Sequence, residues 1–258
     1  METLQPLPSE SQPAAGSLMS RLLNVFAAPA EVFDEIKSAK SSAANWLVPV
    51  LLGCLVGIIY SVVVFSQDNI MQSIREAQEQ AIRGKFQKSV DAGKMSKEQV
   101  DQAVEMTQRF SGPTLMKVFG SFGAVVFNFG MVFLAGLVVW LVGAKAFKGQ
   151  FNYMKAVETA GLAGMINVLG GLIAIPLAVM MGNMAMTPGP VLLVHEFNPA
   201  NKLHILLSQI NLVMLWYLAV LALGLARLSR VSFGKAAVCL FFIWAAFVAL
   251  AVLPGWGR

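Results

Sequence analysis

The sequence predicts an all-α protein that crosses a membrane five times. Hydrophobic residues make up 57% of its 258 residues and charged residues only 13%, against about 25% charged in a soluble globular domain. Five stretches without Asp, Glu, Lys, Arg or His approach or exceed the roughly 20 residues that a helix needs to cross the hydrocarbon core. These runs are apolar on every face, which favours helices over barrel strands of about ten residues with alternating polarity. The expected fold is therefore a polytopic bundle of five transmembrane helices.

The five spans are expected at residues 46–65, 118–144, 159–181, 205–226 and 236–253. Trp46, Trp140 and Trp256 lie near their ends, where an amphipathic ring prefers the headgroup level. Glycines are frequent in the first three spans, and Gly53 and Gly57 form a GxxxG pair in the first. Because small residues let helix backbones approach closely in lipid, we expect this pair to pack helices, within the chain or between two copies.

Two segments precede the first span. Residues 1–16 contain three prolines, two acids and no apolar core, which indicates a disordered tail rather than a signal peptide. Residues 17–45 carry apolar residues at helical spacing, and Pro29 suits the first turn of a second helix. This amphipathic pair is expected either to lie along the membrane surface or to pack under the bundle. A short tail, 254–258, ends the chain.

Residues 68–117, between the first two spans, predict a helical hairpin with eight basic and seven acidic residues. Residues 91–94 are typical of a turn, and Ser96 with Gln99 has the form of a capping box that opens the second helix. The expected apolar faces are Ile70, Ile74, Ala77 and Ala81 in the first helix and Val100, Val104 and Phe110 in the second. Since two thin helices have little core of their own, we expect the hairpin to rest on the bundle, the membrane or a second copy.

The short loops predict how the chain is oriented, because Lys and Arg collect in cytoplasmic loops. The basic residues are Lys145, Lys148 and Lys155 after the second span and Arg227, Arg230 and Lys235 after the fourth. Both loops fall on the side of the N-terminus, so we expect a cytoplasmic N-terminus and an extracytoplasmic C-terminus. The 68–117 insertion is expected to be extracytoplasmic, since long balanced segments translocate largely regardless of charge.

The sequence lacks the motifs of catalysis and of metal binding. No glycine-lysine pair has the spacing of a phosphate-binding loop. The two histidines, His195 and His204, flank a loop with Glu196, and a metal site there would need more ligands than the sequence offers. Cys54 and Cys239 lie within predicted spans and are expected to behave as small apolar residues. We therefore predict no catalytic residue, no cofactor and no metal.

Ionisable residues are missing from the predicted spans, and Glu158 lies only at the edge of the third. This argues against a proton-coupled pump and against an intramembrane protease, because both need such groups inside the membrane. The net charge of +5 does not indicate nucleic-acid binding, since no basic stripe with interleaved aromatic residues is present. The excess of basic residues is better explained by the collection of Lys and Arg in the cytoplasmic loops of membrane proteins than by nucleic-acid binding.

Four amides remain in the apolar runs: Asn128, Asn167, Gln209 and Asn211. Amides in a bundle usually bond between helices and hold them together. The alternative is a small-solute transporter or channel component, in which Asn128, Asn167 and Asn211 would line a polar cavity. The Gly170-Gly171 pair and Pro176 keep this alternative open, because they are able to break the third helix and broken helices build transporter sites.

Three stretches together resemble the YIP-domain family, the Rab/Ypt-interacting membrane proteins and their bacterial relatives. They are residues 22–36, the loop 143–151 that runs on into the third span, and residues 223–237. The resemblance implies five spans, a cytoplasmic N-terminus and, for eukaryotic members, an adaptor role in vesicle trafficking with small GTPases. This chain departs from the eukaryotic pattern, because it has the long 68–117 insertion and lacks an acidic-aromatic N-terminal segment. Both departures favour a bacterial member of the family, located in the inner membrane, and disfavour small-GTPase binding.

The predicted function is non-enzymatic, as an adaptor or a membrane-organising component. Its expected partners are membrane lipids, further copies of the chain or other membrane proteins. Arg227, Arg230 and Lys235 are the candidate residues for contact with lipid headgroups or a partner, because each basic residue near an anionic leaflet adds about 1 kcal/mol of attraction. The alternative for these three is charge that only sets topology.

Overall fold

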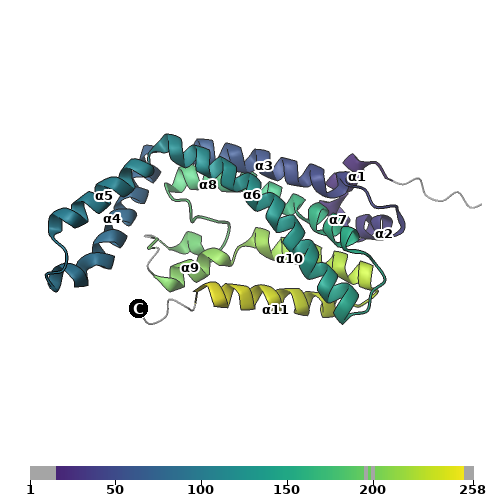
Figure 1. Cartoon of the computed structure of the whole chain (residues 1–258). Helices are drawn as coiled ribbons and strands as arrows, with labels where there is room; N and C mark the ends of the chain where they lie inside the picture. The colour runs from purple at the N-terminus through teal and green to yellow at the C-terminus, as the bar shows by residue number, and fades with distance from the viewer. Residues whose placement is uncertain (1–15, 195–196, 199–200, 253–258) are drawn as a thin grey trace, which may run out of the picture.

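The computed structural model describes residues 16–194, 197–198 and 201–252, and every regular element in this part is helical. Five segments are long and apolar enough to cross a membrane, which confirms the predicted fold class: Ala44–Val64, Pro113–Ala146, Tyr153–Met181, Leu212–Ser229 and Phe233–Leu250. They extend in roughly one direction across the view in Figure 1. The expected tails lie outside the described residues, apart from Gly16.

The two ends of the bundle differ. At one end, the chain leaves α3 (Ala44–Val64) and forms a protruding pair of helices, so we call it the hairpin end (Figure 1). At the other end, α6 (Pro113–Trp140) continues into a π-helical turn, η1 (Leu141–Ala146), and two short basic loops follow η1 and α10 (Leu212–Ser229). We call this the basic-loop end.

The second and third membrane segments both start earlier than expected. Pro113 fits the first turn of α6, which therefore begins five residues before residue 118. The third segment consists of α7 (Tyr153–Ala163) and α8 (Met165–Met181), which meet at Gly164. The Gly170-Gly171 pair and Pro176 do not break the third helix: all three residues lie within α8, and the two glycines face Val213 and Val56 of neighbouring helices.

The fourth membrane segment begins at Leu212, not at residue 205 as expected. Residues 205–209 belong to a separate short helix, α9 (Lys202–Gln209), and the chain is extended at residues 210–211. Two contacts fix the break: the Asn211 side chain accepts a hydrogen bond from the Met214 N–H (2.8 Å), and the Leu212 N–H donates to the Pro188 carbonyl (2.9 Å). Asn211 is thus the N-cap of α10, a role that its amide fits well. The last segment is α11 (Phe233–Val252).

Replacing Asn211 by alanine is expected to lower the free energy of unfolding by about 1 kcal/mol, because it removes the N-cap of α10. The matched control is Asn24→Ala, which removes an exposed amide that donates to Ser20 Oγ of the same helix. Thermal unfolding in a mild detergent measures both variants. Equal effects of the two substitutions would contradict the capping role.

The helices of the 68–117 insertion are α4 (Asp68–Asp91) and α5 (Lys97–Phe110), with the expected capping box at Ser96 and Gln99. Arg83 pairs with Glu79 of its own helix α4 (2.8 Å) and joins α4 to α5 through Asp101 (2.9 Å). The hydrogen bonds to Glu79 and then to Asp101 raise the pKa of Arg83 above its ordinary value.

The expected apolar faces of the insertion are only partly correct. The residues buried in α4 and α5 are Ile70, Met71, Val100 and Val104, whereas Ala77, Ala81 and Phe110 are exposed. The buried residues of α4 lie at its start, beside the bundle, where Ile70 packs with Val64 of α3 and Ala178 of α8. The rest of α4 extends away from the bundle with α5 beside it, so Ala77 and Ala81 lie away from the bundle and stay exposed (Figure 1).

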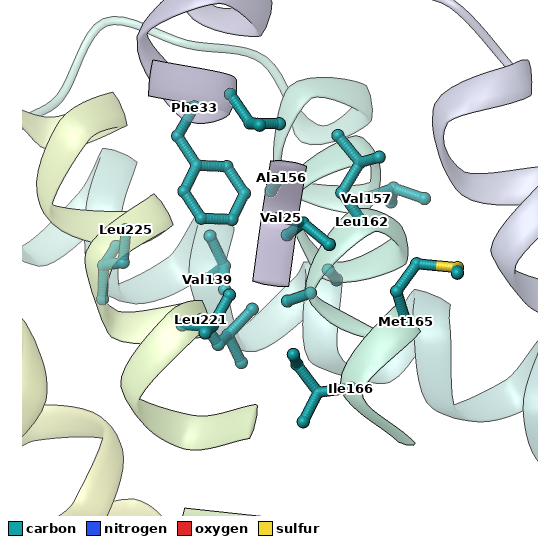
Figure 2. Packing of buried hydrophobic residues seen from close by; sticks show 14 of the residues in the cluster. Val25, Phe33, Val139, Ala156, Val157, Leu162, Met165, Ile166, Leu221 and Leu225 are labelled. Carbon is teal, nitrogen blue, oxygen red and sulfur yellow. The ribbon is translucent and has the colours of Figure 1, made fainter. Parts of the chain in front are cut away.

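The N-terminal helices α1 (Leu18–Ala27) and α2 (Pro29–Ser38) pack on the bundle, which is the second of the two expected arrangements. The residues that they bury in the main core are Leu22, Val25, Val32, Phe33 and Ile36. Figure 2 shows Val25 and Phe33 among core residues of the membrane helices such as Val139 and Leu225. The opposite face of α1 stays apolar and exposed at Met19 and Leu23.

Candidate functional site

A buried carboxylate, Glu158, lies at the basic-loop end in the middle of α7 and is 1% exposed. Its Oε2 accepts hydrogen bonds from Asn45 Nδ2 (2.8 Å) and Lys155 Nζ (3.4 Å), and its Oε1 accepts one from the Ser42 backbone N–H (3.2 Å). A buried charge is tolerated only when it is paired and hydrogen-bonded. Both oxygens of Glu158 meet this requirement, so the group joins α7 to the start of α3.

Arg21 of α1 extends this cluster to the N-terminal helices. Its Nη1 donates to Asn45 Oδ1 (3.2 Å), and its Nε and Nη2 donate to Glu35 Oε1 of α2 at 3.1 and 2.8 Å. Asn45 therefore uses both ends of its amide, one toward Glu158 and one toward Arg21. A continuous chain of polar contacts thus connects α2, α1, α3 and α7, and it holds the N-terminal pair to the membrane segments.

Two loops lie at the basic-loop end, residues 147–152 after η1 and residues 230–232 after α10. The first loop and η1 pack closely on Ser229, the last residue of α10, directly before the second loop. A Cβ on Gly149 would lie 2.9 Å from Ser229 Cα, and a Cβ on Gly143 of η1 would lie 2.7 Å from Ser229 Oγ. The Gly149 N–H also donates to the Gly143 carbonyl (2.9 Å), which folds the first loop back onto η1. We call these two loops and the adjoining ends of η1 and α11 the basic surface.

The three candidate contact residues differ in their surroundings. Arg227 Nη1 lies 3.3 Å from Asp34 Oδ2, so it pairs with α2. Lys235 Nζ lies 4.9 Å from the centre of the Phe147 ring. Arg230 is exposed and takes a left-handed backbone conformation at the end of α10. The structure therefore brings Arg230 and Lys235 to the basic surface and gives Arg227 a contact with the N-terminal pair.

Two further lysines belong to the basic surface. Lys145 Nζ lies 5.0 Å from the centre of the Trp140 ring, and Lys148 is exposed with a left-handed backbone. From the sequence, both lysines indicate only the orientation of the chain in the membrane. Nothing in the sequence shows that the segments around residues 145–149 and 229–235 lie together in space. That Glu158 is buried and paired was also not predicted from the sequence. Lys155, three residues earlier, was the available indication of an ion pair, because residues three apart lie on the same face of a helix.

The amides of the membrane segments have three different settings. Asn128 of α6 faces Gly53 of α3, and its Nδ2 donates to Ala124 O of its own helix (2.8 Å). Asn167 is exposed on α8, and Asn211 caps α10. Gly57 faces Ala124, so both glycines of the GxxxG pair lie at the contact between α3 and α6. The amides do not share one lining, which gives the transporter alternative no support.

The remaining polar candidates that the structure describes do not gather into a site. Nδ1 of His204 accepts a hydrogen bond from the Asn198 N–H (3.1 Å), whereas His195 and Glu196 lie outside the described residues. Within the described part of the chain, no group of three His, Cys, Asp or Glu side chains is placed to hold a metal ion. Cys54 and Cys239 are free thiols.

Comparison with known proteins decides the family. The sequence model of the Yip1 domain matches residues 23–253. The chain belongs to the Yip1 domain family. Neither the curated proteins nor the solved structures contain a match. The matched range starts within α1, so in this Yip1-domain protein the N-terminal pair is part of the domain, together with the five membrane segments and the α4–α5 insertion.

Proposed function

We propose that this multi-pass Yip1-domain protein is a non-enzymatic adaptor or membrane-organising component that uses its basic-loop end as the interaction face. The observation that carries this proposal is the basic surface itself. Segments far apart in the sequence lie together at one end of the bundle: the two loops present Lys148 and Arg230, and the adjoining ends of η1 and α11 present Lys145 and Lys235. The α1–α2 pair lies beside them, where Asp34 of α2 contacts Arg227.

The buried polar cluster supports a structural role rather than chemistry. A general base needs a carboxylate that is free to take a proton from a bound substrate. Both oxygens of Glu158 accept hydrogen bonds from the chain itself, and Lys155 compensates its charge. Arg227, Arg230 and Lys235 remain the proposed contact residues. Arg227 would position α2, while Arg230 and Lys235 would meet headgroups or a partner.

The proposed orientation has the N-terminus and the basic surface in the cytoplasm, and the C-terminus and the α4–α5 insertion outside it. The positive-inside rule supports this arrangement, because the basic loops are short and both lie at the same end. A bacterial inner membrane fits the long α4–α5 insertion. The proposed partners are anionic lipids, a second copy of the chain or another membrane protein.

Accessibility labelling tests the orientation. Single cysteines replace Asp91, Gln150 or Ser232, all exposed, in a chain whose Cys54 and Cys239 are changed to alanine. In intact cells, a membrane-impermeant maleimide is expected to modify the residue-91 variant only, and the other two only after lysis. The reverse pattern would place the basic surface outside the cell and would overturn the proposed orientation.

Photo-crosslinking tests the adaptor role. A photoreactive amino acid at position 232, on the basic surface, is expected to capture discrete partner proteins or a second copy in native membranes. The same amino acid at Lys94, exposed at the tip of the insertion, serves as the matched control. Equal capture patterns at the two positions, or capture of lipid alone at position 232, would count against a protein-adaptor role.

A further inference from the structure

We propose that Lys148 and Arg230 together bind the phosphate of an anionic phospholipid headgroup. This inference deepens the proposed function and rests on it for the side of the membrane. Lys148 precedes Gly149 in the first loop, and Arg230 follows Ser229 at the end of α10; Gly149 packs against Ser229, which brings the two positions close together. Two cations on adjoining loops are suited to hold one phosphate between them, because its oxygens accept several charge-assisted hydrogen bonds.

The backbone at both positions points to a role for the side chains. Lys148 (φ 58°) and Arg230 (φ 55°) are the two non-glycine residues with left-handed backbones among those that the structure describes. That conformation is unfavourable for any residue with a Cβ, and glycine is the usual choice where a helix ends in this way. Arg230 ends α10 in this manner, with its N–H bonded to the Ala226 carbonyl. A cation rather than glycine at both of these neighbouring positions is explained if the two positive charges bind a common anion.

The neighbouring cations each contact another side chain of the protein, which distinguishes them from this pair. Lys145 lies over Trp140, Lys235 lies over Phe147, and Arg227 pairs with Asp34. In the described ranges, neither Lys148 nor Arg230 has a carboxylate within 4.0 Å of its side chain or an aromatic ring beneath it. They are therefore available for an anion from outside the chain.

The position of the pair selects a lipid as the source of that anion. The two loops directly follow apolar membrane segments, and Trp140 and Tyr153 stack edge-to-face beside them with ring centres 6.3 Å apart. Aromatic residues of this kind lie at the headgroup level of a bilayer. Cations at that level meet the phosphates of anionic lipids, as basic residues beside membrane segments do in general.

The decisive variant is Lys148→Gly/Arg230→Gly, because glycine removes both charges and relieves the left-handed backbone. Native mass spectrometry of the full chain in a neutral detergent, with added phosphatidylglycerol, measures the affinity. We expect about thirtyfold weaker binding than in the unmodified chain, since two headgroup-level cations are lost. Phosphatidylcholine, which carries no net charge, is expected to bind both proteins equally weakly. The unfolding temperature without added lipid is expected not to fall.

The matched control is Lys88→Ala/Lys94→Gly, which removes two exposed cations from the α4–α5 insertion and should retain phosphatidylglycerol binding. A second variant, Lys148→Gln/Arg230→Gln, keeps side chains of similar length and should lose binding as the glycine variant does. Unchanged affinity in both Lys148/Arg230 variants, or equal loss in the control, would overturn the inference. So would equal affinity for soluble glycerol phosphate, which would identify a free-phosphate site. The lipid-binding assay uses protein in detergent and does not depend on orientation in a membrane. A negative binding result would therefore be distinguishable from a failure of the proposed orientation.

Discussion

Replacing Glu158 by alanine is expected to destabilise the protein by about 3–5 kcal/mol, the range seen when one partner of a buried ion pair is removed. The carboxylate is 1% exposed, and its partner Lys155 has a side chain that is 10% exposed. Without Glu158, the Lys155 ammonium stays buried without its counter-charge. The Asn45 amide and the Ser42 N–H also lose their acceptor, and each unsatisfied buried donor adds to the cost.

The loss is also expected to loosen the N-terminal helices, because Asn45 connects Glu158 to Arg21. Thermal unfolding in detergent measures the stability, and limited proteolysis between α2 and α3 measures the attachment of the pair. Replacing both charged partners, Lys155→Met with Glu158→Leu, should recover much of the stability, since a buried pair exchanged for apolar side chains is often neutral or better. Arg109→Ala, which breaks an exposed pair with Glu105, is the control and should cost at most about 1 kcal/mol.

A small effect of Glu158→Ala, comparable to that of Arg109→Ala, would mean that water reaches the cluster and that the carboxylate does not hold α3 to α7. A double variant as unstable as the single one would mean that the hydrogen bonds from Asn45 and Ser42, rather than the charge of Lys155, set the cost.

The membrane segments were predictable because their signal is a length of uncharged sequence, and that length follows from the thickness of the bilayer. Their ends were less predictable because they depend on local contacts. The start of α10 is an example: residues 205–211 carry no charge and so extend the uncharged run of α10, but the contacts of Asn211 with Met214 and of Leu212 with Pro188 lie where α9 and α10 separate. Hydropathy averaged over a window of residues cannot detect a helix boundary that depends on one capping amide.

The candidate site was predictable only in part, for a related reason. Charge counting identified the two basic loops, since each loop is local in the sequence. Their contact through Gly149 and Ser229 joins residues 80 positions apart, and no periodicity reports such a distance. The cluster at Glu158 likewise depends on Asn45, 113 positions away. The α1–α2 pair shows a third limit, because the apolar spacing of an amphipathic helix is the same whether it lies on lipid or on protein.

Replacing Gly161 by alanine is expected to be strongly destabilising, although the same substitution usually stabilises a helix by up to about 1 kcal/mol. Gly161 is buried in α7 where it crosses α3, and an added Cβ would collide with Trp46 Cα and lie 2.5 Å from Trp46 Cβ and 3.1 Å from the Asn45 carbonyl. The colliding atoms belong to backbone or lie next to it, so no side-chain rotation relieves the overlap. We expect a loss of about 1–3 kcal/mol from overpacking.

The matched control is Gly123→Ala in α6, where an added Cβ meets nothing within 4 Å. Because this position is exposed, alanine should leave the unfolding temperature unchanged or raise it. The two variants carry the same chemical change in the same kind of helix, so an opposite sign isolates the close approach of α3 and α7. Equal effects at the two positions would show that this approach is looser than the structure has it.

The Gly161→Ala variant also tests whether this crossing supports the basic-loop end. Asn45, whose carbonyl lies beside Gly161, is the residue that links Glu158 to Arg21. Pushing α3 away from α7 should therefore lengthen the Asn45–Glu158 contact as well as disturb the packing. Combining Gly161→Ala with Glu158→Ala should then cost less than the sum of the two single losses, because residues in one contact network are not additive. Strict additivity would mean that the helix crossing and the polar cluster hold the N-terminal pair independently.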